Sequence, residues 1–192
     1  MNRAAHTAHA KGFSLVEVMV ALIIVSVGLL GIAKMQALLL ADTGVSRVRA
    51  LVALEASSLA ASIQANPDYW ASAPNGLAVA IDPSATTPVV AQNDATLSSA
   101  ISAAVTNSAL CESTGSTACT AANMAGYDLV QWEQAMASVV GNAKTNLACS
   151  TTNQQVTCTI TIDWQENTVN ATAQEQGSTA FQNQSYQMVV QP

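Results

Sequence analysis

The chain has 192 residues, of which 9% are charged and 4% are aromatic, and its formal net charge is -6. This length fits one globular domain with an accessory segment. With so few rings, Leu, Val and Ile must supply most of the core. A net negative charge argues against nucleic-acid binding, which normally needs a basic face.

The N-terminal region combines a short basic segment with a long apolar run. Residues 1–12 are polar, with Arg3 and Lys11 and no acid, and the apolar run follows from Phe13 to Ala33. A helix needs about 20 such residues to cross a bilayer. The basic flank is expected to stay in the cytoplasm, so the rest of the chain faces outward. Glu17 interrupts the run, although an acid at mid-membrane costs about 2.5–3.5 kcal/mol, and less near the edge.

Three simpler interpretations of this run remain open. A secretory signal peptide would be cleaved near the small residues of Gly31-Ile-Ala33, yet an acid at the start of its apolar core is unusual. A plain membrane anchor gives Glu17 no role. An amphipathic core helix would be apolar on one stripe, whereas this run is apolar on all sides.

The segment Lys11-Gly-Phe-Ser-Leu-Val-Glu17 resembles the type III signal of type IV prepilins. That signal is a basic leader ending in Gly, then Phe, three residues and Glu, followed by an apolar helix. The resemblance implies that a prepilin peptidase cuts between Gly12 and Phe13 and methylates the new amino group of Phe13. Because Gly12 has no side chain, its backbone lies close to the protease without obstruction.

In pilins the carboxylate at the position of Glu17 is expected to meet the charged N-terminus of a neighbouring subunit. Each charge alone is costly in an apolar environment, so the two neutralise one another only when subunits are in register. Loss of Arg3 and Lys11 with the leader would leave 4 bases against 12 acids, a side-chain charge of -8.

A helical pattern continues beyond the apolar run as far as Asn66. Asn66-Pro67 is a stop, because the residue before a proline avoids the helical region. Arg47 would lie opposite an apolar stripe, with Arg49 and Glu55 at its margins. The stripe recurs at helical spacings and consists of Leu38, Val45, Val48, Val52, Leu59 and Ile63.

Two glycines, Gly28 and Gly31, lie inside this long helix and weaken it by about 1 kcal/mol each relative to alanine. They indicate either close helix packing in the membrane or a segment that unwinds when the subunit leaves the bilayer. Many major pilins have a proline near the position of Lys34, and this chain does not.

The remainder, from Pro67 on, alternates weak and clear patterns. Residues 67–108 are predicted to be a surface connection with one short helix from Ala95 to Val105. A second helix is predicted from Thr120, a possible N-cap, to Val140, before Gly141-Asn142. Its apolar face comprises Ala125, Leu129, Trp132, Met136 and Val139. We interpret Trp132 as a core anchor.

Strict alternation predicts a strand from Val156 to Trp164, with residues 146–151 as its hairpin partner. A last strand is predicted from Tyr186 to Val190, after a loop over residues 165–179. The whole reads as an α+β fold, a long helix packed against a small antiparallel sheet.

Four cysteines in the second half of the chain suggest two disulfides in an oxidising compartment. If Asn153-Gln154 forms a two-residue loop, Cys149 faces Cys158 on a non-hydrogen-bonded pair, with Cα atoms about 4.5 Å apart. Cys111–Cys119 is then left as the second bond, although three connectivities are possible. A zinc site is disfavoured, because no C-x-x-C spacing occurs and both histidines lie far away. No metal or cofactor is expected.

The head resembles, more weakly, the minor pilins called PilV, or type IV pilus modification proteins. The resemblance lies in Met124-Ala-Gly-Tyr-Asp-Leu-Val-Gln-Trp132, Thr161-Ile-Asp-Trp164, Val18-Met-Val-Ala-Leu-Ile23 and Gly28-Leu-Leu-Gly31. It implies the type IV pilin fold in three parts: a leader (1–12), a long helix (13–66, transmembrane over 13–34) and an α+β head in the periplasm or outside the cell (67–192).

No catalytic constellation is visible, so the protein is not expected to be an enzyme. Asp128 and Glu133, and likewise Asp163 and Glu166, are interpreted as solvated charges. The resemblance implies a minor pilin held in the bacterial inner membrane, which enters the extracellular pilus and serves pilus assembly, motility or adhesion. Its partners would be the prepilin peptidase, other minor and major pilins and the inner-membrane assembly machinery. A type II secretion pseudopilin and a DNA-uptake pilin are the alternatives.

Overall fold

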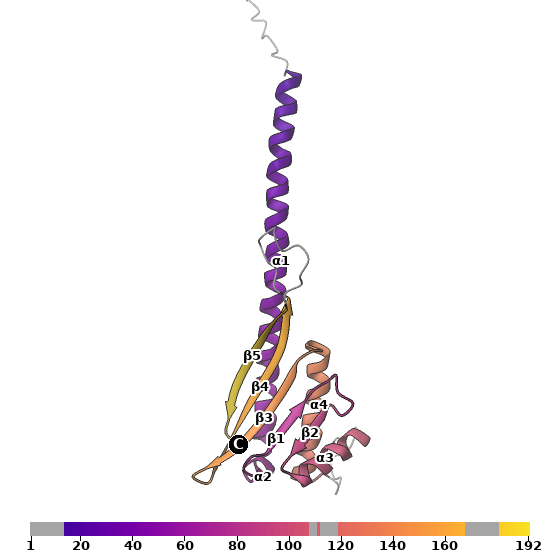
Figure 1. The fold of residues 1–192 in the computed structure, drawn as a ribbon, viewed down its shortest axis with the longest axis vertical. Coiled ribbons are helices and arrows are strands. Elements are labelled where there is room, and N and C mark those ends of the chain that lie inside the picture. Colours follow the sequence, from indigo (N-terminus) through magenta and orange to yellow (C-terminus); the bar gives the residue numbers. More distant parts are fainter. Residues whose placement is uncertain (1–13, 108–110, 112–118, 168–180) are drawn as a thin grey trace, which may run out of the picture. The chain divides into compact units, whose positions relative to one another are not determined.

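The computed structural model describes residues 14–107, 111, 119–167 and 181–192, without the side chains of residues 37, 38, 41 and 42. By its contacts the chain divides into two compact units, Met1–Thr43 and Gly44–Pro192. The elements (Figure 1) are α1 (Leu15–Ala65), α2 (Pro67–Trp70), β1 (Ala78–Ile81), β2 (Val89–Gln92), α3 (Ala95–Thr106), α4 (Ala121–Val139), β3 (Lys144–Thr152), β4 (Gln155–Asn167) and β5 (Phe181–Val190).

Helix α1 ends at Ala65, directly before the predicted Asn66-Pro67 stop. Its part in the second unit presents the predicted stripe to the core: Val52, Leu59 and Ile63 are fully buried. Val45 and Val48 are half-buried, and the side chain of Leu38 lies outside the described residues. Ala56, which the predicted stripe omitted, is also fully buried, because it continues the same face one turn after Val52.

The five strands form one antiparallel sheet in the order β2-β1-β3-β4-β5. Along β4 the even-numbered residues from Val156 to Glu166 are buried, while the odd-numbered ones are half-buried or exposed. The sheet therefore has one face toward the core and one toward solvent, as alternation in an antiparallel sheet requires.

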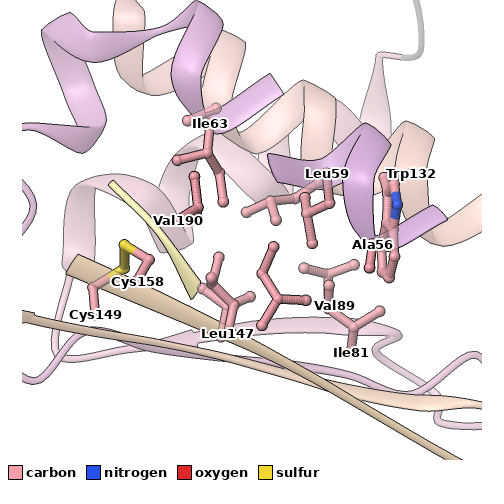
Figure 2. Close-up of a cluster of buried hydrophobic side chains, with 14 of the residues drawn as sticks. Ala56, Leu59, Ile63, Ile81, Val89, Trp132, Leu147, Cys149, Cys158 and Val190 are labelled. Atoms are coloured by element: carbon pink, nitrogen blue, oxygen red, sulfur yellow. A yellow bond between two sulfur atoms is a disulfide. The ribbon is translucent and has the colours of Figure 1, made fainter. Parts of the chain in front are cut away.

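The core of the second unit lies between α1, α4 and the inner face of the sheet. Figure 2 shows Ala56, Leu59 and Ile63 from α1 beside Trp132 from α4 and Leu147 from β3. The Trp132 Nε1–H donates a hydrogen bond of 2.8 Å to the carbonyl oxygen of Glu55. Trp132 is 6% exposed, which confirms its interpretation as a core anchor and ties α4 to α1.

The prediction of a surface connection over residues 67–108 is wrong. This segment contains α2, β1, β2 and α3, and β1 pairs with β3 inside the sheet. Leu77, Val79 and Ile81 are buried, alternating with the small Ala78 and Ala80. Two strands of four residues each give little periodic signal, so their pairing with longer strands decides their structure.

The predicted helix at 95–105 is confirmed as α3. The Asp94 carboxylate accepts hydrogen bonds from the backbone N–H groups of Thr96 and Leu97, at 2.8 and 3.0 Å. This N-cap satisfies two of the donors that the start of a helix leaves unpaired.

The second predicted helix is confirmed as α4, and the Thr120 hydroxyl accepts a hydrogen bond from the Asn123 N–H. The hairpin also has the predicted register, with Thr152 opposite Gln155 and Cys149 opposite Cys158. Asn153 and Gln154 have φ values of 53° and 66°. Positive φ at both positions is the geometry of a two-residue turn whose twist matches that of the strands.

The predicted loop over residues 165–179 is wrong at its start, because β4 continues to Asn167. The last strand also begins earlier than predicted, at Phe181, and pairs with β4 as far as Asn167. Hydrogen bonding between β4 and β5 therefore extends both strands beyond the segments whose apolar alternation predicted them. The rest of the predicted loop lies outside the described residues.

Candidate functional site

The first functional element is the apolar stretch Leu15–Gln36, which has the length and composition to span a membrane. At 1.5 Å per residue, a helix of 22 residues extends about 33 Å, which matches the hydrocarbon core of a bilayer. Its described side chains are all exposed. Such a surface requires lipid or other apolar helices around it.

Glu17 lies in the first turn of α1, exposed among these apolar side chains. The carbonyl oxygen of Ser14 accepts hydrogen bonds from the N–H groups of Glu17 (3.0 Å) and Val18 (3.2 Å). A carboxylate in this turn is favoured by the partial positive charge at a helix N-terminus. Gly12 and Phe13 lie outside the described residues, so the predicted cleavage and methylation stay predictions.

Helix α1 continues without interruption through Gly28 and Gly31. A Cβ atom built at either glycine would meet nothing within 4 Å. Close approach to another of the described parts of this chain therefore does not explain the two glycines. Helix packing with another subunit and local unwinding both remain predictions.

The two disulfides of the structure join Cys111 to Cys119 and Cys149 to Cys158. The Cα atoms of Cys149 and Cys158 are 4.0 Å apart, close to the distance that a non-hydrogen-bonded pair predicts. Both cysteines are buried, and their bond closes the end of the β3–β4 hairpin.

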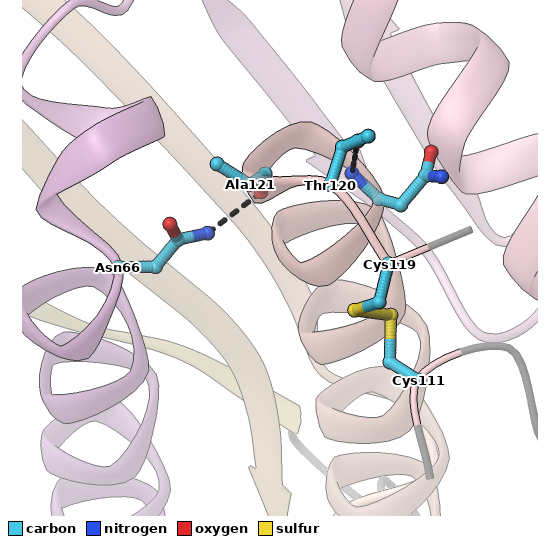
Figure 3. Close-up of a disulfide and its surroundings, with 6 residues drawn as sticks. Asn66, Cys111, Cys119, Thr120 and Ala121 are labelled. Atoms are coloured by element: carbon cyan, nitrogen blue, oxygen red, sulfur yellow. Dashed lines mark hydrogen bonds between the residues drawn. A yellow bond between two sulfur atoms is a disulfide. The ribbon is translucent and has the colours of Figure 1, made fainter. Parts of the chain in front are cut away.

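Cys119 lies directly before the capped start of α4 (Figure 3). There the Asn66 side-chain amide donates a hydrogen bond of 2.7 Å to the carbonyl oxygen of Ala121. This bond joins the end of α1 to the start of α4. The Cys111–Cys119 disulfide thus lies at the junction of two helices.

The interpretation of Glu166 as a solvated charge is wrong. Its side chain is 5% exposed and accepts hydrogen bonds from Arg49 on α1, at 3.1 Å from Nε and 2.8 Å from Nη2. The Trp164 Nε1–H also donates a hydrogen bond of 2.9 Å to the same carboxylate. Arg49 holds the pKa of Glu166 below its usual range. A sequence separation of 117 residues hides this pair from local pattern reading.

The two acids on α4 are not fully solvated either. Glu133 is 8% exposed and Asp128 is half-buried, and burial raises the pKa of both, that of Asp128 to about 6. Asp163 is exposed, as predicted. Because Asp163 and Glu166 lie on opposite faces of β4, they do not form an acid–base pair. The described residues contain no group of three or more His, Cys, Asp or Glu placed to hold a metal ion.

Comparison with protein families finds one match, over residues 7–33, to the family described as Prokaryotic N-terminal methylation motif. No curated protein and no solved structure matches the chain. The matched segment contains Gly12, Phe13 and Glu17 and most of the apolar stretch. The chain therefore carries the N-methylation motif of type IV pilins and pseudopilins, followed by a pilin-like fold of one long helix and an α+β head.

Proposed function

We propose that this chain is a PilV-like minor pilin, a structural subunit that takes part in assembly of a type IV pilus. The methylation motif supports a pilin- or pseudopilin-like structural subunit. The observation that carries the proposal is Glu17, an acid exposed at the start of an apolar span that no other described part of the chain covers.

The motif implies processing by a prepilin peptidase. In the proposed reaction the peptidase hydrolyses the bond between Gly12 and Phe13 on the cytoplasmic side and then methylates the Phe13 amine. The mature chain then begins with an amine four residues ahead of Glu17. Residues 1–12 form the leader, and the head follows the helix.

Glu17 is then available to the neighbouring subunit. A carboxylate within apolar surroundings is costly alone, and the methylated amine of another subunit offers the opposite charge. The pair forms only in one longitudinal register of the two helices, so it selects the correct stagger during assembly. The role proposed for Glu17 is assembly and not catalysis.

Before assembly the chain would reside in the inner membrane as a single-pass protein with its head in the periplasm. A single N-terminal apolar helix behind a prepilin motif is consistent with this location. The proposed partners are other minor and major pilins, through α1, and the inner-membrane assembly machinery. The adhesion, motility or surface sensing of the pilus would be properties of the filament.

A minor pseudopilin of a type II secretion system is the second candidate, because it would share the signal and the helix. The segment from Tyr127 to Trp132 favours the pilus by resemblance. A DNA-uptake pilin is less favoured. Beyond residue 43 the bases are Arg47, Arg49 and Lys144, and two of these form ion pairs with Glu166 and Asp82.

The decisive experiment is the mass of the N-terminal peptide, taken from native membranes of cells with and without their prepilin peptidase. We expect a chain that starts at N-methylated Phe13, and only when the peptidase is present. Gly12→Val should block this cleavage, because the branched valine side chain would keep the backbone from lying close to the peptidase. Ala10→Val is the matched control and should be cleaved normally.

A chain that keeps Met1, or one that starts near Lys34, would contradict the proposal. Either result would indicate an ordinary membrane-anchored or secreted protein. Glu17→Gln separates processing from assembly. The variant should be cut and methylated normally but be recovered at least about tenfold less often in sheared filaments, since it loses the charge pair.

A further inference from the structure

A surface hollow of about 560 Å³ lies at one end of the sheet in the second unit. It is formed by the β1–β2 connection, the α4–β3 turn and strands β3, β4 and β5. Its lining consists of Ser84, Gly141, Asn142, Lys144, Asp163, Trp164, Gln165 and Asn183. Apart from the mostly buried ring of Trp164, the lining side chains are short or polar.

Three of these polar side chains, those of Asp163, Gln165 and Asn183, are exposed and make no hydrogen bond or ion pair with the described residues. Gln165 and Asn183 lie directly opposite each other on neighbouring strands, which places their Cβ atoms about 5 Å apart. The Asn142 amide lies close by and donates a long hydrogen bond of 3.5 Å to the backbone oxygen of Gln165. The hollow thus offers several amide donors and acceptors within a small area.

The charges around the hollow disfavour an anionic ligand. Its one base, Lys144, pairs with Asp82 at 2.8 Å. The Lys144 ammonium, with help from Ser84, lowers the pKa of Asp82 to about 2. Asp163, which faces Lys144 across the strands, adds a second carboxylate. One ammonium against two carboxylates leaves the site with no free cation for a phosphate, sulfate or carboxylate.

Beyond the hollow, the described part of the outer sheet face carries no charged side chain, although it includes the exposed apolar Val189 beside Thr159. Strand register and burial place its polar residues on the solvent side. They are Asn146, Ser150, Thr157, Thr159, Thr161, Ser185 and Gln187. A chain of neutral hydroxyl-bearing units that starts in the hollow would continue over hydroxyl and amide groups without meeting a repulsive charge.

From this arrangement we propose that the hollow binds a neutral oligosaccharide. Sugar hydroxyls donate and accept hydrogen bonds together, and side-chain amides and carboxylates provide both partners. A peptide bound as an amphipathic helix or as a proline-rich segment fits less well, since these two modes need an apolar or aromatic-lined groove. Oligosaccharide binding goes beyond the proposed role in pilus assembly. It does not depend on that role, because binding is measured on the isolated full-length chain, outside any filament.

The test uses full-length protein in a polyoxyethylene detergent, because maltoside and glucoside headgroups are themselves neutral sugars. Saturation-transfer NMR is recorded with cellotriose, triacetylchitotriose and lactose, and with a heparin hexasaccharide as the anionic probe. We expect at least one neutral probe to bind in the millimolar range or tighter, and the heparin fragment not to bind. Asn183→Ala and Gln165→Ala should each weaken that binding about tenfold.

The matched control is Gln64→Ala, which removes an exposed amide from α1, outside both the hollow and the outer face of the sheet, and it should leave the affinity unchanged. Unfolding followed by tryptophan fluorescence checks that each variant is folded. The proposal is overturned if no neutral probe binds at millimolar concentration, if the heparin fragment binds more tightly, or if both hollow variants bind like the parent protein. None of these outcomes changes the expected N-terminal processing.

Discussion

Arg49 and Glu166 form the strongest contact that the structure shows between the second part of α1 and the end of β4. The contact is bidentate, and its carboxylate is almost fully buried, whereas the Arg49 side chain is 53% exposed. The two partners are therefore not equivalent. Removing the base leaves a buried charge without this counter-ion, while neutralising the acid leaves an arginine whose side chain is half exposed to water.

We expect Arg49→Ala to lower the free energy of unfolding by about 2–4 kcal/mol, and Glu166→Gln by about 1–2 kcal/mol. The smaller cost for Glu166→Gln is expected because the glutamine side-chain oxygen still accepts the hydrogen bond from the Trp164 N–H. Urea unfolding of the detergent-solubilised chain, followed by tryptophan fluorescence, measures both values. Arg47→Ala, on the exposed side of the same helix, is the matched control and should stay within about 0.5 kcal/mol of the parent.

A double variant completes this test. In the Glu166→Gln background, Arg49→Ala should cost much less than in the parent, because the buried charge that it would leave unpaired is absent. Equal costs in both backgrounds would mean that the Arg49 side chain stabilises the head by packing and not through the ion pair.

At the scale of elements, the packing of α3 on α4 depends on Gly126. A Cβ atom at this position would lie 2.7 Å from the backbone carbon of Ala100 and 2.8 Å from the backbone nitrogen of Ile101. Backbone atoms of a helix do not yield as a flexible side chain does. The two helices would have to separate, which exposes part of the core between them.

We therefore expect Gly126→Ala to destabilise the head by about 1–3 kcal/mol, although alanine favours an isolated helix by about 1 kcal/mol. The urea midpoint measures the difference. Gly44→Ala in α1 is the matched control, because its Cβ would meet nothing within 4 Å. This control should be neutral or stabilising, and a similar loss in both variants would refute the packing argument.

The elements that the sequence predicted correctly are those whose signals are local. The β3–β4 register followed from alternation and from one two-residue turn, and the face of α4 followed from helical spacing. Strands β1 and β2 were missed because four residues carry little period, although the alternation of Leu77, Val79 and Ile81 was a usable signal. Glu166 was missed because its partner Arg49 is distant in sequence. The alternation along β4 was a usable local signal, because it places Glu166 on the buried face and Asp163 on the exposed face.

At the scale of the whole molecule, buried and paired carboxylates give the head a definite dependence on pH. Lys144 and Arg49 lower the pKa values of Asp82 and Glu166, so the stability from these pairs is present at neutral pH and is lost as the acids are protonated in strong acid. Burial acts oppositely on Asp128 and Glu133: it raises the pKa of both carboxyls, that of Asp128 to about 6, because their ionised forms are disfavoured in the folded head.

The two effects together place the stability maximum in mild acid. As the pH falls from 8 to 5, the folded head binds a proton at Asp128, whose pKa is about 6, while the unfolded chain binds it only near 3.8. Folding is therefore favoured by proton uptake in this window. In stronger acid the unfolded chain binds protons at Asp82 and Glu166 before the folded head does, so stability falls again, and the Asp82 contribution is fully lost only as the pH passes its folded pKa of about 2.

Urea unfolding should accordingly show a higher midpoint at pH 5 than at pH 8. The buried Trp70, Trp132 and Trp164 all lie in the second unit, so tryptophan fluorescence reports on the head without a contribution from the apolar span. Asp128→Asn should remove most of the rise. Water reaches this half-buried carboxyl, so we expect a gain of about 1 kcal/mol at pH 8 and no gain near pH 4. The exposed Asp68→Asn is the control and should keep the rise, while a midpoint that stays flat from pH 8 to 5 would show that burial of Asp128 does not control the stability of the head.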